Sequence, residues 1–364
     1  MIDRVQLREI DWILIGLLLA NALIGIGLVT SSSHYLSGNF AIRQLLWLLV
    51  SLIALFLTLS IDYKILLGFS PYIFGFFIVL LGALLAFGGA VSGARSWLFN
   101  AAFFGGQPSE LAKIGLILIL ARIFSEFRLR TLSLPFGLLG AGVTGLAFAV
   151  IGLQPDLGTA VSLLPILAGA LVLAGLTRRT LALVLVGTLA FGFVGWNFVL
   201  KDYQKKRLMT LVNPSQDPRG SGYHVLQSKI AIGSGGISGK GFMKGTQSRL
   251  RFLPARHTDF IFSVLGEEFG FLGVVFVFLL YFLFLARLFT SVPKSRDRAG
   301  SYIIFMVACL LTFQFLVNVM MIVGLFPVTG VPIPLLSYGG SSLLTTFLAV
   351  GLAVNVKMRR YVNV

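Results

Sequence analysis

Residues 10–30 read IDWILIGLLLANALIGIGLVT, an apolar stretch long enough to cross the roughly 30 Å hydrocarbon core of a bilayer as one helix. Similar runs recur along the chain of 364 residues, of which 57% are hydrophobic and only 12% charged. A soluble protein carries about 25% charged residues, so the composition predicts an integral membrane protein. No small-residue cleavage site followed by soluble sequence appears, and the first run is therefore predicted to be an anchor rather than a cleavable signal peptide.

Ten spans are predicted, which makes the expected fold an all-α polytopic membrane protein. No soluble domain boundary, low-complexity tract or fixed-period repeat divides residues 1–364, so we expect a single domain, with two tandem halves left open. The one cysteine, Cys309, lies in an apolar run and can form no intramolecular disulfide. The spans are expected near residues 11–30, 42–60, 70–89, 110–124, 134–152, 159–176, 180–200, 260–287, 301–325 and 340–356.

The placement of the basic residues predicts the topology. The net charge of +16 could suggest nucleic acid, but no basic helix interleaved with aromatic residues appears, and the charges follow the loops instead. Cytoplasmic loops carry the excess of Lys and Arg, which predicts that both termini are cytoplasmic. The inner connections would hold Arg4, Arg8, Lys64, Arg122, Arg128, Arg130, Arg178, Arg179, Arg287, Lys294, Arg296, Arg298, Lys357, Arg359 and Arg360, and the short outer ones only Arg43, Arg95 and Lys113.

A long polar segment, residues 201–259, separates the seventh and eighth predicted spans and is predicted to be one large extracytoplasmic loop. It carries 11 of the 29 Lys and Arg residues and eight glycines. Within it we expect a short amphipathic helix over residues 223–232 and flexible backbone over residues 233–245. The GSGGISGKG stretch at 233–241 could cradle a phosphate together with Lys240, or it could simply be flexible. It lacks the Walker pattern, which disfavours nucleotide binding.

The loop ends in an acid, Asp259, which directly precedes the apolar residues 260–262. An ionisable group at a membrane boundary suggests a functional site. An aspartate at the start of a helix can also act only as an N-cap, because it accepts hydrogen bonds from free backbone N–H groups. Thr258 could cap the helix equally well. From the residues alone, both interpretations of Asp259 stay open.

Other outer charges suggest a shared polar cavity. Glu110 and Lys113 stand three residues apart on one helical face, as a structural ion pair or as a cavity wall. Asp156 follows the fifth span, where it could merely cap the sixth helix. Arg95, beside a tryptophan, is either an interfacial anchor or an outer cation. Because Asp259 would lie at the same face, the three acids and their basic partners predict one outer cavity.

Three polar features lie in or near the last spans. At least one of the adjacent Glu267 and Glu268 should face protein or water rather than lipid. Gln314 and Asn318 share a helix face, where hydrogen bonding between helices is the expected role. Residues 331–340 form an uncharged outer segment whose broken backbone is expected to dip toward the cavity. With three histidines and one cysteine, no zinc-type ligand cluster is expected.

Several segments resemble the SEDS family, named for shape, elongation, division and sporulation, and they run through most of the chain in family order. The glycine pattern at 239–245 is more similar to the RodA branch than to the FtsW branch. One departure is Ala255. The family usually has glutamate directly after the proline that precedes HTD, which is Pro254 in this chain. The matching segments are GARSWL (93–98), QPSELAKI (107–114), QPDLGTA (154–160), residues 213–247, HTDFIF (257–262), GEEFG (266–270) and PLLSYGGSS (334–342).

The resemblance implies a peptidoglycan glycosyltransferase that polymerises lipid II at the outer face of the bacterial cytoplasmic membrane, during elongation and cell-shape maintenance. It also implies a class B penicillin-binding transpeptidase as partner. The family's essential acid corresponds to Asp259, the expected general base. Expected substrate-binding positions are Arg95, Glu110, Lys113, Asp156, Lys229, Lys240 and His257.

No organic cofactor is expected for this reaction, whereas carboxylates and a pyrophosphate could together hold a hard divalent cation such as Mg²⁺ or Mn²⁺. The metal ligands stay unassigned. A different class of function is also compatible with intramembrane charges: a flippase that moves lipid II across the membrane through a polar path.

Overall fold

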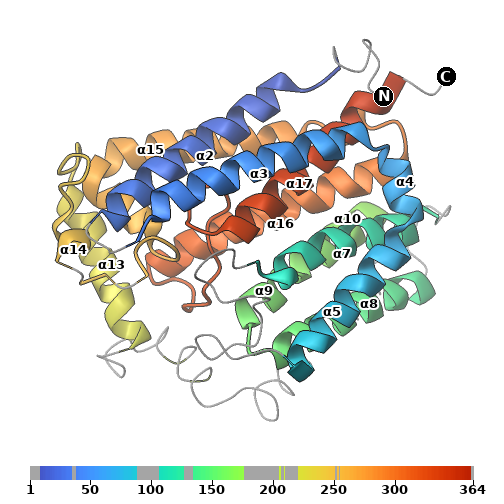
Figure 1. Ribbon diagram of the computed structural model, residues 1–364, viewed down its shortest axis with the longest axis horizontal. Coiled ribbons are helices and arrows are strands. Elements are labelled where there is room, and N and C mark those ends of the chain that lie inside the picture. Colours follow the sequence, from blue (N-terminus) through green and yellow to red (C-terminus); the bar gives the residue numbers. More distant parts are fainter. Residues whose placement is uncertain are drawn as a thin grey trace.

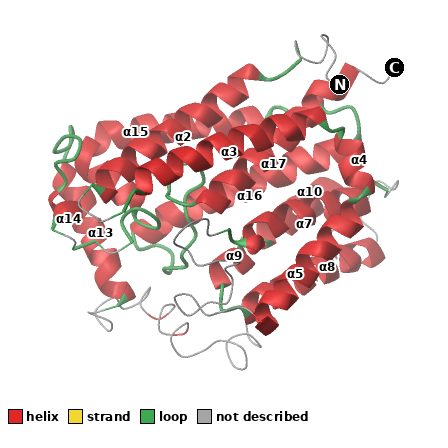
Figure 2. Cartoon of the chain, in the orientation of Figure 1, coloured by secondary structure: helices red, strands yellow, loops and turns green. Residues whose placement is uncertain are grey.

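The computed structural model describes residues 9–34, 38–87, 106–126, 134–175, 205, 209, 220–250, 252, 253 and 255–361. This part of the chain is helical, without a strand (Figure 2). It contains eight helical spans that are long and apolar enough to cross a membrane, judged by length and composition. The prediction of an all-α polytopic membrane protein is confirmed. The predicted seventh span at 180–200, and Arg95, lie outside the described residues.

The helices follow the predicted spans closely. The first part of the chain forms α2 (Trp12–Ser33), α3 (Phe40–Ser60), α4 (Tyr63–Gly68), α5 (Ser70–Phe87), α7 (Pro108–Ser125), α8 (Leu134–Leu153), α9 (Leu157–Val161) and α10 (Leu164–Ala174). The second part forms α13 (Ser221–Gly235), α14 (Thr246–Arg249), α15 (Ile261–Phe289), η3 (Val292–Lys294), α16 (Arg298–Ile322), α17 (Gly340–Met358) and η4 (Arg359–Tyr361).

Two spans differ in detail from the prediction. The sixth span is broken into α9 and α10, because Pro165 lies at the start of α10 and α9 ends after one turn. The ninth span begins at residue 298 rather than 301, since Asp297 caps α16 by accepting a hydrogen bond from the backbone N–H of Gly300 at 2.8 Å. The helix expected at 223–232 is confirmed and extends over Ser221–Gly235.

The helices form a bundle with two distinct ends (Figure 1). The start of α2, the end of α17 and α4 lie at one end, and we call this the terminal end. The opposite, distal end carries α13 and α14 and the starts of α9 and α15. The centre of the bundle contains α7 and α17, whose residues are almost all buried. Burial of α7 in protein explains how a helix with Glu110 and Lys113 near its start can lie in a membrane domain.

Asp11 joins three helices at the terminal end. Its side chain caps α2 by accepting from the Leu14 backbone N–H at 3.2 Å, and it also pairs with Arg287 of α15 at 2.9 Å and with Lys357 of α17. Burial alone would raise the pKa of Asp11, but the hydrogen bonds from Lys357 and Arg287 outweigh it and hold this pKa below its ordinary value.

The helix α15 is interrupted at Gly270, where the backbone turns to φ 63° and ψ −162°. The glycine-rich stretch after α13 supplies the hydrogen bonds that this break removes. The N–H groups of Phe271 and Leu272 donate to the carbonyls of Gly236 and Ile237 at 2.9 and 3.1 Å. A Cβ at Gly270 would lie 2.4 Å from the Gly239 nitrogen, so only glycine allows this approach.

Candidate active site

One connection at the distal end, residues 323–339 between α16 and α17, contacts several of the predicted site residues, and we call it the α16–α17 segment. It enters the bundle closely enough that a Cβ on Gly25 of α2 would lie 2.1 Å from the Leu335 carbonyl oxygen. Val331, Ile333 and Leu336 are buried. The broken backbone predicted for this segment is confirmed, and it is buried. A membrane protein tolerates such backbone only inside protein or around a water-filled cavity.

The segment holds the backbone around Asp259 in place. The side-chain amide of Asn318, on α16, donates to the carbonyls of Asp259 and Val331 at 3.0 and 2.7 Å. The Ser337 hydroxyl donates to the carbonyl of Thr258 at 2.7 Å and accepts from the Ile333 N–H at 3.0 Å. Residues 258 and 259 are thus fixed by side chains from α16 and from the segment.

Asp259 does not occupy the N-cap position of α15. Helix α15 begins at Ile261, and Phe260 occupies its N-cap position without a side-chain cap. The carboxylate of Asp259 is half-buried and lies over Gly330, where an added Cβ would be 3.8 Å from Oδ2. Its side chain therefore lies beside the α16–α17 segment and is not part of the start of α15.

Two other contacts bring distant residues to the same segment. The ammonium of Lys229, on α13, lies at its start, where a Cβ on Gly324 would be 2.8 Å from Nζ. Gly158 of α9 lies against its middle, with a Cβ position only 2.4 Å from the carbonyl oxygen of Thr329. Residues 329–331 therefore contact both Asp259 and the short helix that Asp156 caps.

Asp156 does cap a helix, as the simpler interpretation had it: its Oδ1 accepts from the Thr159 N–H at 3.2 Å at the start of α9. Its other oxygen accepts from the amide of Gln107, directly before α7. Burial raises the pKa of Asp156 above its ordinary value, against the hydrogen bonds from Thr159, and the negative charge of Glu110 raises it further. Asp156 thus connects α9 to the polar start of α7.

Glu110 and Lys113 form the predicted ion pair, with 2.6 Å between Nζ and Oε1. Their side chains are only 6% and 1% exposed, so the pair is inside protein. A buried pair is costly to break, because the remaining charge would lose both its partner and water. It lies next to Asp156, to which both charges contribute electrostatically.

His257 forms a three-ring cluster with two aromatic residues, with ring centroids 4.9 Å from Phe40 and 5.7 Å from Tyr338. Its carbonyl accepts from the Tyr338 N–H at 2.8 Å, which ties it to the α16–α17 segment. Burial, and secondarily the charge of Arg256, hold the pKa of His257 below its ordinary value. The imidazole is therefore kept neutral.

Lys240 lies apart from this group, on the glycine-rich stretch. Its ammonium pairs with Glu267 of α15 at 2.7 Å, and its backbone N–H donates to the Glu267 carbonyl at 3.1 Å. The Gly241 N–H likewise donates to the Glu268 carbonyl at 2.9 Å. These amides therefore donate to carbonyls of the interrupted α15. The two predictions for this stretch, a phosphate cradle and a flexible loop, were wrong. Glu267 and Glu268 are both buried in protein, as predicted for at least one of them.

Within the described ranges, no group of three or more His, Cys, Asp or Glu side chains is placed to hold a metal ion. Two of the acids in the predicted site are already engaged, Glu110 by Lys113 and Asp156 by Thr159 and Gln107. These donors do not fit a protein-held divalent cation.

Residues 9–362 match the FtsW/RodA/SpoVE family of cell cycle proteins. The chain belongs to the SEDS family. It is 40% identical to the peptidoglycan glycosyltransferase MrdB of Escherichia coli K12, over 80% of this chain and 79% of that protein. Among solved structures it is similar to RodA of Thermus thermophilus, with 31% identity and a TM-score of 0.72 over 97% and 98% of the two chains. It is also similar to a chain of a peptidoglycan synthase complex that coordinates polymerization and crosslinking, with 32% identity and a TM-score of 0.81 over the same shares.

In this SEDS chain, sequence reasoning missed the residues that hold Asp259. Asn318 was expected to bind a neighbouring helix, whereas it binds the backbone of Asp259 and of the α16–α17 segment. Ser337 was not singled out individually, although it lies in the SEDS-like stretch PLLSYGGSS. The sequence offered one signal for this role: a polar residue on a span that is followed by a proline-rich connection.

Proposed function

We propose that this chain, a peptidoglycan glycosyltransferase of the SEDS family, polymerises lipid II into glycan strands during cell elongation and shape maintenance, with Asp259 as general base. The observation that carries the proposal is the fixed position of Asp259 beside the α16–α17 segment, at the distal end of the bundle. The similarity to MrdB and RodA supports the same reaction and branch.

The proposed chemistry transfers a sugar from one lipid-linked chain to another. A hydroxyl oxygen of the acceptor sugar attacks the anomeric carbon of the donor, the bond from that carbon to the diphosphate oxygen breaks, and the lipid pyrophosphate leaves with the electron pair. Asp259 takes the hydroxyl proton, a role that typically contributes about 10² to 10⁴ in rate. Attack from the back of an α-linked diphosphate gives a β-linkage by inversion.

Basic residues near Asp259 would stabilise the departing diphosphate. Lys229 has its ammonium at the start of the α16–α17 segment. The buried Lys113 lies near Asp156. We propose that Lys229, with Arg95 from outside the described residues, binds the pyrophosphate electrostatically. Glu110, Lys113 and Asp156 shape the polar wall of the cavity, and His257 contacts the acceptor or donor sugar as a neutral group. Lys240, bound to Glu267, would need to leave that ion pair to reach substrate.

A divalent cation is not needed for any of these steps. If Mg²⁺ or Mn²⁺ takes part, the substrate diphosphate would be its main ligand, because the described carboxylates do not gather around one point. Repeating the polymerisation assay with and without a chelator tests this proposal directly.

We propose that the distal end faces outward and both termini lie in the cytoplasm, from the excess of Lys and Arg near the terminal end. A class B penicillin-binding transpeptidase is the proposed partner, supported by the synthase complex that pairs polymerization with crosslinking in a similar chain. Such a partner would link the strands that this chain makes.

The second candidate function is a lipid II flippase, because several charges lie inside the bundle. Purified protein given lipid II in detergent separates the two functions. Glycan strands that depend on Asp259 support the transferase. Movement of lipid II across liposome membranes without any polymer would support the flippase and contradict the proposal.

A further inference from the structure

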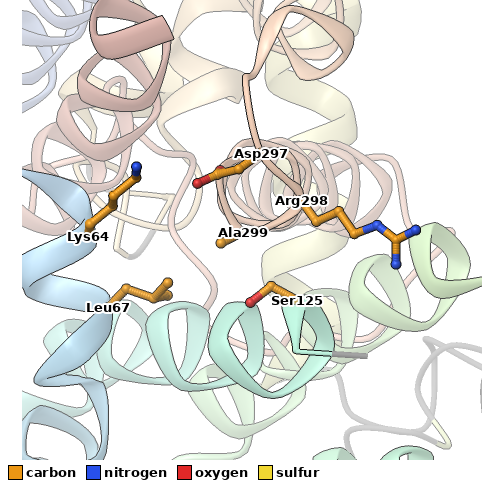
Figure 3. A pocket seen from close by; sticks show the side chains of 6 residues that line it. All are labelled: Lys64, Leu67, Ser125, Asp297, Arg298 and Ala299. Carbon is orange, nitrogen blue, oxygen red and sulfur yellow. The ribbon is translucent and has the colours of Figure 1, made fainter. Parts of the chain in front are cut away.

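A cavity lined by both charged and apolar side chains lies at the terminal end, away from Asp259. It has a volume of about 630 Å³ and lies between α4, the end of α7 and the start of α16. Its lining consists of Lys64, Leu67, Ser125, Asp297, Arg298 and Ala299 (Figure 3). The volume is in the range of small-molecule sites, roughly 300 to 1,000 Å³. Nothing in the proposed sugar transfer uses this cavity.

The side chains that line the cavity carry two formal positive charges, on Lys64 and Arg298, and one negative charge, on Asp297. Glu126 is paired with Arg122 and Asp62 with Arg359, each at 3.4 Å. Asp297 accepts from the Tyr63 hydroxyl at 2.7 Å and from the N–H of Gly300, so both of its carboxylate oxygens already have a hydrogen-bond donor. Lys64 forms no ion pair with any residue that the structure describes. An anion is the ligand that this balance favours.

The side chains are arranged as two cations around two hydrogen-bonding groups. Lys64 and Asp297 point toward each other across the cavity, while Arg298 extends in the opposite direction and Ser125 lies between the two ends (Figure 3). A phosphate could lie at either cation. Hydroxyl groups of the same ligand could donate to Asp297 or bind Ser125. A glycerophosphate group has this combination of charge and hydroxyls.

The surroundings point to a lipid as the source of that phosphate. On and beside α4, the apolar side chains of Ile61, Ile65 and Phe69 are 44%, 54% and 57% exposed, which suits contact with acyl chains. Basic pockets between membrane helices at the cytoplasmic side are typical sites for anionic lipid headgroups. We propose that this cavity binds the glycerophosphate headgroup of an anionic phospholipid, with the acyl chains along the exposed face of α4. The proposal does not depend on the glycosyltransferase function.

The test compares two pairs of charge substitutions in the full-length detergent-solubilised chain. Lys64→Gln with Arg298→Gln changes the cavity, and Lys294→Gln with Arg296→Gln removes the same two charges from the neighbouring connection without changing the lining. Native mass spectrometry then measures the binding of added phosphatidylglycerol, phosphatidylcholine and soluble glycerol phosphate. We expect the unmodified chain and the control pair to bind phosphatidylglycerol selectively, and the cavity pair to bind it roughly tenfold more weakly.

Three results would overturn the proposal. Equal losses in both pairs would mean a general effect of charge, and unchanged binding in the cavity pair would place the lipid elsewhere. Competition by soluble glycerol phosphate at equal concentration would make this a site for a free phosphate ligand or an acidic partner. If the double substitution does not fold, the single Lys64→Glu at this exposed position makes the same comparison.

Discussion

The side-chain nitrogen of Asn318 lies 3.0 Å from the carbonyl oxygen of Asp259 and 2.7 Å from that of Val331. One amide thus joins α16, the residue proposed as base, and the α16–α17 segment. Because Asn318 binds the backbone and not the carboxylate, it positions Asp259 without taking part in the proton transfer.

Replacing Asn318 with alanine should slow catalysis more than it weakens substrate binding. The buried Val331 carbonyl would lose its donor, at a cost of about 1–3 kcal/mol, the part-buried Asp259 carbonyl would lose the same donor, and Asp259 could shift. We expect kcat for lipid II polymerisation to fall at least about tenfold with KM little changed. Gln314→Ala, one turn earlier on the same helix, is the matched control. An equal fall in both variants would contradict a positioning role for Asn318.

The fold was largely predictable from the sequence, whereas the contacts that make the site were not. Apolar length predicts spans, and the spacing of Glu110 and Lys113 predicts their pairing, because both signals are local. The bond between Asn318 and Asp259 joins residues far apart in sequence, and only the packing of α15, α16 and the segment brings them together. The glycine-rich stretch carried no signal of its partner, because nothing in its composition indicates a break at Gly270.

The ion pair between Glu110 and Lys113 can be tested for structural and functional roles together. Glu110→Gln alone leaves a buried ammonium without its partner, and we expect a loss of about 3–5 kcal/mol in unfolding free energy, seen as a lower Tm in detergent. Glu110→Leu with Lys113→Met removes both charges and should restore most of the Tm. If the pair also shapes the substrate cavity, the double variant stays inactive; full activity would show that the pair is only structural.

Gly158→Ala tests the close contact between α9 and the α16–α17 segment. A Cβ there would lie 2.4 Å from the Thr329 carbonyl oxygen, so backbone must move, at a cost of about 1–3 kcal/mol. Because residues 329–331 also contact Asp259, polymerisation should fall together with stability. A Cβ at Gly152 in α8 would have no heavy atom within 4 Å. Gly152→Ala should therefore leave polymerisation and stability unchanged. Equal effects of the two substitutions would argue against this contact.

The lowered pKa of His257 predicts how the stability of the fold depends on pH. Its folded-state pKa lies below the usual value near 6.5, so the unfolded chain takes up the proton first as pH falls. The stabilisation is complete above pH 6.5 and is lost as pH falls through the folded-state pKa. Thermal unfolding of the native chain between pH 8 and pH 5 should therefore show a decrease in Tm that is smaller in His257→Gln. Parallel pH curves for the two proteins would contradict this account.

The role of Asp259 is tested most directly by lipid II polymerisation with purified native protein, Asp259→Ala and Asp259→Asn, each with a matching Tm. Asparagine keeps the shape of the side chain but cannot accept the proton. We predict glycan strands from the native chain and a fall of about 10² or more in rate for both variants. Polymerisation at the native rate by folded Asp259→Asn would contradict the account.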